Sequence, residues 1–153
     1  MAFKIINSFM NRMKGIIKMT RREVREGVFL LLFQNELSAI EINETAEACV
    51  EAFEMELNNE VKGLAEKIVL KYDELDGIIG KYSETREVSR ISKINKTILR
   101  LAIYEIIYCP NVPDVVAVNE AVELSKKYAE KKDSGFINGI LGNVLKDKPD
   151  ASE

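Results

Sequence analysis

Apolar residues recur at spacings of three and four along most of the chain, which is the period of an α-helix. The run over 93–108 is apolar on nearly every side, so we expect a central, buried helix there. Pro110 and Pro113 end that run. The other runs predict helices at 20–37, 43–57, 59–80, 84–90, 114–131 and from 133 onwards. The pattern therefore predicts an all-α fold, a compact bundle of about seven helices.

Polar residues mark where several of these helices should begin. Thr20 and Glu23 have the S/T-x-x-E spacing of a capping box, in which each side chain bonds the other residue's backbone amide. We expect similar N-caps at the starts of three later helices. These are Asn43, Asp114, and either Asp133 or Ser134.

Residues 1–18 read differently from the rest, because they contain basic and apolar residues but no acid. Met10 and Met13 belong to a helically spaced apolar set, so a short basic amphipathic helix is one interpretation. We favour a disordered leader that results from an upstream start codon, with Met19 as an alternative start. The sequence thus predicts an atypical leader over 1–18, one helical domain over 19–148 and a flexible tail over 149–153.

Composition argues against an enzyme. The chain has no histidine, which is the commonest general base and transition-metal ligand. Its two cysteines, Cys49 and Cys109, provide no disulfide framework or zinc site and fit a reduced, cytoplasmic setting. No phosphate-binding or nucleophile-elbow motif occurs, and no apolar run is long enough to span a membrane. We therefore expect no catalytic residues, metal or cofactor.

Charge is distributed unevenly along the chain. Residues 1–25 hold seven Lys or Arg against one acid, whereas the remainder holds fifteen basic and twenty-four acidic residues. Arg21, Arg22 and Arg25 fall in the first turns of a predicted helix, where the helix dipole disfavours cations. An anionic ligand would compensate for this cost, and a purely solubilising role is the alternative.

Glu105 lies within the most apolar predicted helix. Burying its carboxylate without a hydrogen-bonding partner would cost at least about 1–3 kcal/mol. It therefore either bonds a neighbouring helix, which the physics favours, or belongs to a surface that recognises a protein partner.

Four blocks, in this order and spacing, resemble the NusB family of transcription antitermination factors over most of the chain. They are Met19–Glu26 (MTRREVRE), Ile98–Glu105 (ILRLAIYE), Val112–Tyr128 (VPDVVAVNEAVELSKKY) and Phe136–Leu141 (FINGIL). The resemblance implies an all-α, NusB-like fold. It also implies binding to single-stranded boxA RNA of ribosomal RNA leaders as a heterodimer with the ribosomal protein NusE, within an RNA polymerase antitermination complex.

The resemblance also assigns residues to these roles. The arginines Arg21, Arg22 and Arg25 match the family's RNA-contacting start. A second RNA-facing region matches Lys131, Lys132, Ser134 and Phe136, and NusE contacts are expected around Tyr104, Glu105 and Tyr108. Many relatives carry a basic residue directly before the last phenylalanine. Here that residue is Gly135, so Lys131 or Lys132 would have to supply the phosphate contact.

Two other functions remain open. A NusB-like domain also precedes the catalytic domain of some ribosomal RNA cytosine methyltransferases, although this sequence contains no nucleotide-cofactor motif. A helical adaptor that binds only proteins is the other. Some family members self-associate, so a homodimer is also possible on this resemblance.

Overall fold

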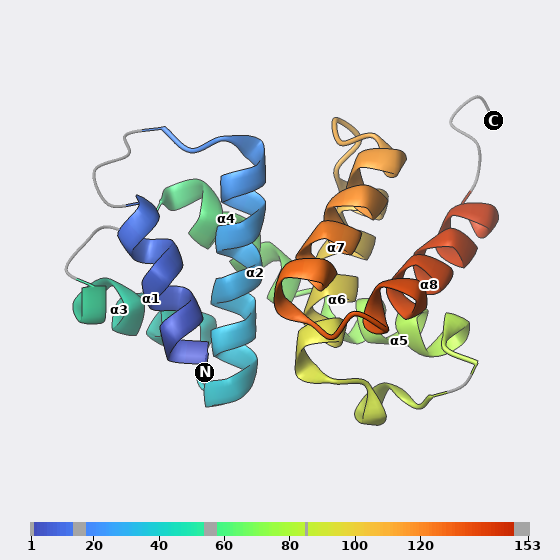
Figure 1. Ribbon diagram of the computed structural model, residues 1–153, viewed down its shortest axis with the longest axis horizontal. Helices are drawn as coiled ribbons and strands as arrows, with labels where there is room; N and C mark the ends of the chain where they lie inside the picture. Colours follow the sequence, from blue (N-terminus) through green and yellow to red (C-terminus); the bar gives the residue numbers. More distant parts are fainter. Residues whose placement is uncertain (1, 14–17, 54–57, 85, 149–153) are drawn as a thin grey trace. The chain divides into compact units, whose positions relative to one another are not determined.

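A computed structural model describes residues 2–13, 18–53, 58–84 and 86–148 of the chain (Figure 1). These residues form eight α-helices and one short 3-10 helix, with no strand among them. The all-α prediction is therefore confirmed. The chain divides into two compact units, Met1–Leu70 and Lys71–Glu153, which are described in turn.

The first unit is built around one helix that packs against three others. The central helix is α2 (Arg21–Ser38), and its partners are α1 (Ala2–Met13), α3 (Ile42–Phe53) and α4 (Asn59–Val69). Every residue of α2 from Val24 to Phe33 is buried. This burial on all sides explains why the helix carries so many consecutive large apolar residues.

The start of α2 is fixed by the predicted capping box. The hydroxyl of Thr20 accepts a hydrogen bond from the backbone amide of Glu23 at 3.1 Å, and the Glu23 carboxylate accepts one from the amide of Thr20 at 2.7 Å. Two amides that a helix start leaves without partners are thus satisfied reciprocally. The first helical residues, Arg21 and Arg22, are placed by this cap.

The leader contains a helix, α1, where we favoured a disordered segment. Phe9, Met10 and Met13 on this helix are buried. Arg12 donates a hydrogen bond to the carboxylate of Glu26 on α2 at 3.1 Å. The amphipathic alternative describes this segment better, because the apolar face of α1 is covered by packing against α2.

The second unit is also organised around one buried helix. Its elements are α5 (Tyr72–Tyr82), η1 (Val88–Arg90), α6 (Lys93–Tyr108), α7 (Asp114–Tyr128) and α8 (Asp133–Asp147). Helix α6 packs against α5, α7 and α8, and it has the bounds that the apolar pattern predicted. It is buried on nearly all sides, as expected for the most apolar stretch of the chain.

Some predicted boundaries are wrong. The single helix expected over 59–80 is two helices, because the backbone leaves helical geometry at Lys71. Among the described residues of the helix expected over 84–90, only Val88–Arg90 are helical, as η1. Asn43 lies inside α3 rather than capping it. Asp114 and Asp133 are the first residues of their helices rather than caps, and Ser134 lies inside α8.

Candidate nucleic-acid interface

Two of the three predicted RNA-contacting arginines are exposed at the first turn of α2. Arg21 and Arg22 both lie on the surface, directly after the Thr20 cap. The guanidinium of Arg21 binds both carboxylate oxygens of Glu60 on α4, with Nη2 2.6 Å from Oε2. This hydrogen-bonded pair raises the pKa of Arg21 and lowers the pKa of Glu60, so both groups are charged at neutral pH.

Arg25 lies one turn further along α2 but differs in exposure. Its spacing of four from Arg21 and three from Arg22 places the three arginines close together on the helix surface. Only 9% of Arg25 is exposed, however, and it already interacts with another group. Arg21 and Arg22 therefore present the accessible positive charge on the first turn of α2.

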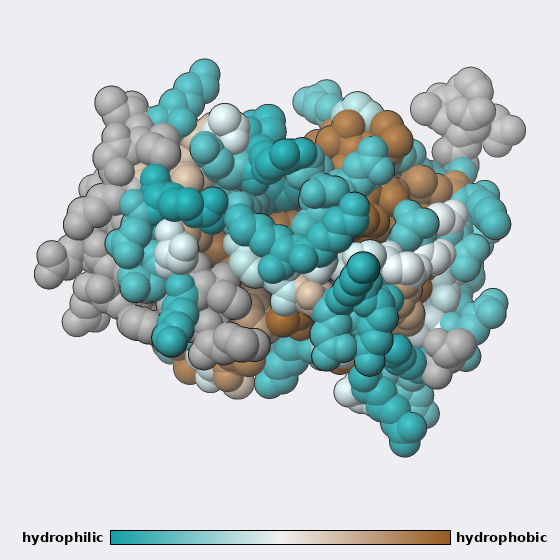
Figure 2. Space-filling view, in the orientation of Figure 1, coloured by the Kyte–Doolittle hydropathy of each residue, from teal (hydrophilic) through white to brown (hydrophobic). Residues whose placement is uncertain are grey.

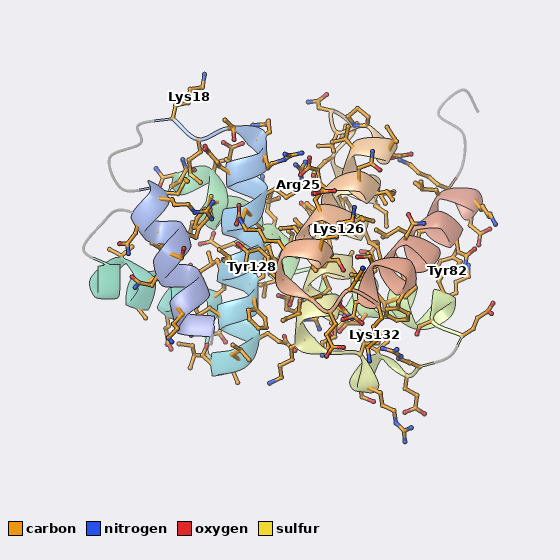
Figure 3. The ribbon with its side chains drawn as sticks, viewed as in Figure 1. Lys18, Arg25, Tyr82, Lys126, Tyr128 and Lys132 are labelled. Atoms are coloured by element: carbon orange, nitrogen blue, oxygen red, sulfur yellow. The ribbon has the colours of Figure 1, made fainter. Side chains whose placement is uncertain are left out.

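The second predicted RNA-facing region is the turn that leads into α8. Lys131 and Lys132 are exposed there, and Lys132 lies 3.3 Å from the carboxylate of Glu130 (Figure 3). Asp133 accepts a hydrogen bond from the backbone amide of Glu130 at 3.1 Å, which closes the turn. Ser134 is half-buried, and its hydroxyl is 3.2 Å from that of Ser125 on α7, so it holds the two helices together.

Phe136 is half-buried on the first turns of α8 and has an arginine on its ring. The guanidinium carbon of Arg86 lies 4.7 Å from the ring centroid. Arg86 belongs to the connection between α5 and α6, and the sequence analysis did not select it. Nothing in the spacing of the two residues along the chain indicates this contact, because 50 positions separate them.

The structure thus brings together the residues of each predicted RNA-facing group. The three arginines share one helix of the first unit, and the four residues of the α8 turn share one end of the second unit.

The predicted partner-binding residues lie near the end of α6, and one of the three is exposed. Tyr104 and Glu105 are only 8% and 4% exposed. Tyr108 is exposed, and its ring centroid lies 5.0 Å from that of Tyr104. The phenol of Tyr108 donates a hydrogen bond to Glu74 on α5, which raises the pKa of the phenol.

Exposed apolar side chains also lie at the end of α6 and at the start of α7, and they were not predicted from the sequence. Val115 is 63% exposed, and Ile107 and Val116 are also exposed. Figure 2 shows a hydrophobic area over the start of α7. Val115 lies three residues before Val118 and seven before Val122, so the apolar pattern places it on the same helix face and does not predict its exposure. We call Ile107, Tyr108, Val115 and Val116 the α6–α7 patch.

Other kinds of site find little support in the described part of the chain. No group of three or more His, Cys, Asp or Glu side chains there could hold a metal ion. No helix in the same ranges is both long and apolar enough to cross a membrane.

Comparison with known proteins places the chain in a family. The model of the NusB family matches residues 22–146. The transcription antitermination protein NusB of Clostridium acetobutylicum is 40% identical over 135 residues, which cover 83% of this chain and 96% of that protein. The NusB of Acetivibrio thermocellus is 39% identical over 132 residues, covering 85% of this chain and 91% of that protein.

Solved structures agree with the sequence comparison. A crystal structure of NusB from T. maritima matches with a TM-score of 0.75 and 27% identity, covering 89% of this chain and 97% of that one. A crystal structure of the antitermination factors NusB and NusE in complex with double-stranded RNA matches with a TM-score of 0.72 and 27% identity. It covers 85% of this chain and all of the matched chain. The chain therefore belongs to the NusB family of transcription antitermination proteins.

Proposed function

We propose that this chain binds boxA RNA of ribosomal RNA leaders together with the ribosomal protein NusE, and that the complex promotes read-through by RNA polymerase. The observation that carries the proposal is the pair of exposed arginines, Arg21 and Arg22, on the first turn of α2. Membership in a family of antitermination factors supports a role in transcription in the cytoplasm and a non-enzymatic function.

Phosphate binding would resolve the unfavourable placement of these arginines. The positive end of the helix dipole repels their charge, whereas a phosphate group is attracted both by that dipole and by the guanidinium groups. Glu60 partly plays this anionic role for Arg21, but the pair is exposed, and exposed ion pairs contribute little to stability. An RNA phosphate can therefore replace Glu60 as the partner of Arg21 with little loss of folding free energy.

The turn before α8 supplies the second proposed contact with RNA. Lys131 and Lys132 are exposed cations directly before the helix, and Phe136 provides an aromatic ring one turn later. Lysines contact phosphates, and an aromatic side chain beside them is typical of sites that bind single-stranded RNA. Lys131 and Lys132, four and three residues before Gly135, would supply the charge that many relatives place at that position.

The α6–α7 patch supports a protein partner. Exposed apolar groups gathered at one place are characteristic of protein interaction sites. Tyr108 adds an aromatic ring, a residue type enriched at such sites. In the related solved structure, NusB is accompanied by both NusE and RNA, which favours NusE as the partner of this chain.

The test is a gel shift with boxA RNA, with and without NusE, using chains that begin at Met1 and at Met19. We expect weak binding by either chain alone and clearly tighter binding with NusE. A boxA sequence of scrambled order and a double-stranded version serve as RNA controls. Val115→Asp should abolish the gain from NusE, whereas Leu70→Asp, also exposed but outside the patch, should keep it.

Three outcomes would contradict parts of the proposal. Binding to NusE without any affinity for RNA would make the chain a protein adaptor. Equal affinity for boxA and scrambled RNA would remove the sequence specificity. If NusE tightens RNA binding by Val115→Asp as much as by the unaltered chain, the partner surface does not include the α6–α7 patch.

A further inference from the structure

The contact between Arg86 and Phe136 combines an exposed guanidinium with a half-buried aromatic ring. The guanidinium carbon lies over the ring at 4.7 Å from its centroid. The ring of Phe136 therefore lies against the guanidinium of Arg86, while the residue as a whole remains exposed. Such a cation–π contact is attractive and orients the planar group.

Two contacts hold the described residues near Arg86, one from Ser83, which directly follows α5, and one from α5 itself. The buried hydroxyl of Ser83 donates a hydrogen bond to the carbonyl oxygen of Arg86 at 2.7 Å. A Cβ added at Gly80 would lie 3.3 Å from Cγ2 of Val88, so η1 packs closely on α5. Arg86 is thus presented by an anchored connection, which lowers the entropy lost when it binds a ligand.

The charges beside this contact suit a polyanion. Lys132 lies four residues before Phe136 at the start of α8, and Lys131 precedes it; both are exposed. A site for single-stranded RNA combines cations that contact phosphates with a planar group on which a base stacks. The two lysines and Arg86 provide these groups.

We propose that Arg86 is a base-stacking residue, in which an unpaired RNA base stacks on the guanidinium face opposite Phe136. The inference rests on the proposed RNA-binding function and adds a residue to it. Guanidinium planes stack on bases, whereas the ammonium group of lysine has no plane to offer. Phe136 then acts through Arg86 by orienting it rather than by touching the base.

The test compares Arg86→Lys and Arg86→Ala in the full chain with NusE, by measuring affinity for boxA RNA across a range of salt concentrations. Loss of one stacked base corresponds to about a tenfold weaker affinity. We expect this loss in both variants, with the salt dependence of Arg86→Lys unchanged. Arg12→Lys is the matched control, because Arg12 also lies over a phenylalanine, Phe9, at 5.6 Å from the ring centroid. It should bind like the unaltered chain.

An abasic scan of the RNA identifies the base. At one position, removing the base should weaken binding by the unaltered chain but not by Arg86→Ala. If the loss of affinity from removing a base and the loss from Arg86→Ala add at every position of the RNA, the proposal is overturned. Unchanged affinity in Arg86→Lys would also overturn it, because Arg86 would then be a simple phosphate contact. Tighter binding by Arg86→Ala would overturn it too, because Arg86 would then block access of the RNA to Phe136.

The same experiment separates this inference from the proposed function. If the unaltered chain binds boxA RNA and Arg21→Ala plus Arg22→Ala weakens it, normal binding by the Arg86 variants refutes only the stacking role. If the unaltered chain shows no affinity for boxA RNA with NusE, both proposals fall.

Discussion

Thr20 has a structural role that is separable from the arginines it positions. Its hydroxyl and the Glu23 carboxylate satisfy two amides at the start of α2. Replacing Thr20 with alanine should lower the free energy of unfolding by about 0.5–2 kcal/mol, the usual value of an N-cap side chain. Chemical denaturation measures this, with the exposed Ser89→Ala as the control. Equal loss in both variants would mean that the capping box contributes nothing particular.

Two helical glycines differ in the space around them and therefore predict opposite effects. A Cβ at Gly27 would lie 3.2 Å from Val61 and 3.3 Å from Phe9, whereas a Cβ at Gly63 would meet nothing within 4 Å. Gly63→Ala should stabilise the protein by up to about 1 kcal/mol through helix propensity.

Gly27→Ala should instead destabilise it by about 1 kcal/mol, because close packing outweighs the gain in propensity. Thermal melts of both variants check this pair. An increase in melting temperature for Gly27→Ala would show that Phe9 on α1 shifts easily to make room for the added methyl group.

Among the elements, α1 joins the first unit through buried side chains that include Phe9, Met10 and Met13. Arg12 also binds Glu26. Phe9→Ala should therefore lower the free energy of unfolding by about 3 kcal/mol, at the lower end of the range for buried phenylalanines. The exposed Ser8→Ala is the control in the same helix. A melting curve for Phe9→Ala that matches the control would mean that α1 does not pack on α2 in solution.

The helices were predictable where an apolar face or an N-cap specifies them. They were less predictable where the backbone leaves helical geometry although the apolar spacing continues. The spacing of Val61, Ile68, Leu75 and Ile79 continues across the break between α4 and α5, so it gave no sign of the break. Leu70, at the break, is an apolar residue that is 83% exposed. The pattern reports which face is buried, but not where a helix ends without Pro or Gly.

At the scale of the whole molecule, sequence specified the chemistry of the candidate site better than its accessibility. Arg21 and Arg22 are exposed as expected, but Arg25, with the same motif and spacing, is buried. Tyr104 and Glu105 are buried for the same reason: they lie on a helix enclosed by three others. Burial depends on tertiary packing, which local spacing does not encode. The contact of Arg86 with Phe136 is similarly non-local.

The central claim, that the start of α2 binds RNA, is tested most directly by the salt dependence of boxA binding. Arg21→Ala plus Arg22→Ala is compared with the unaltered chain, with Lys4→Ala plus Lys67→Ala as a control that removes two exposed cations elsewhere in the first unit. For two lost phosphate contacts, the slope of log affinity against log salt should fall by about 1.4. We predict weaker binding and this shallower slope for the arginine variant alone. Affinity and slope equal to those of the unaltered chain would contradict the account.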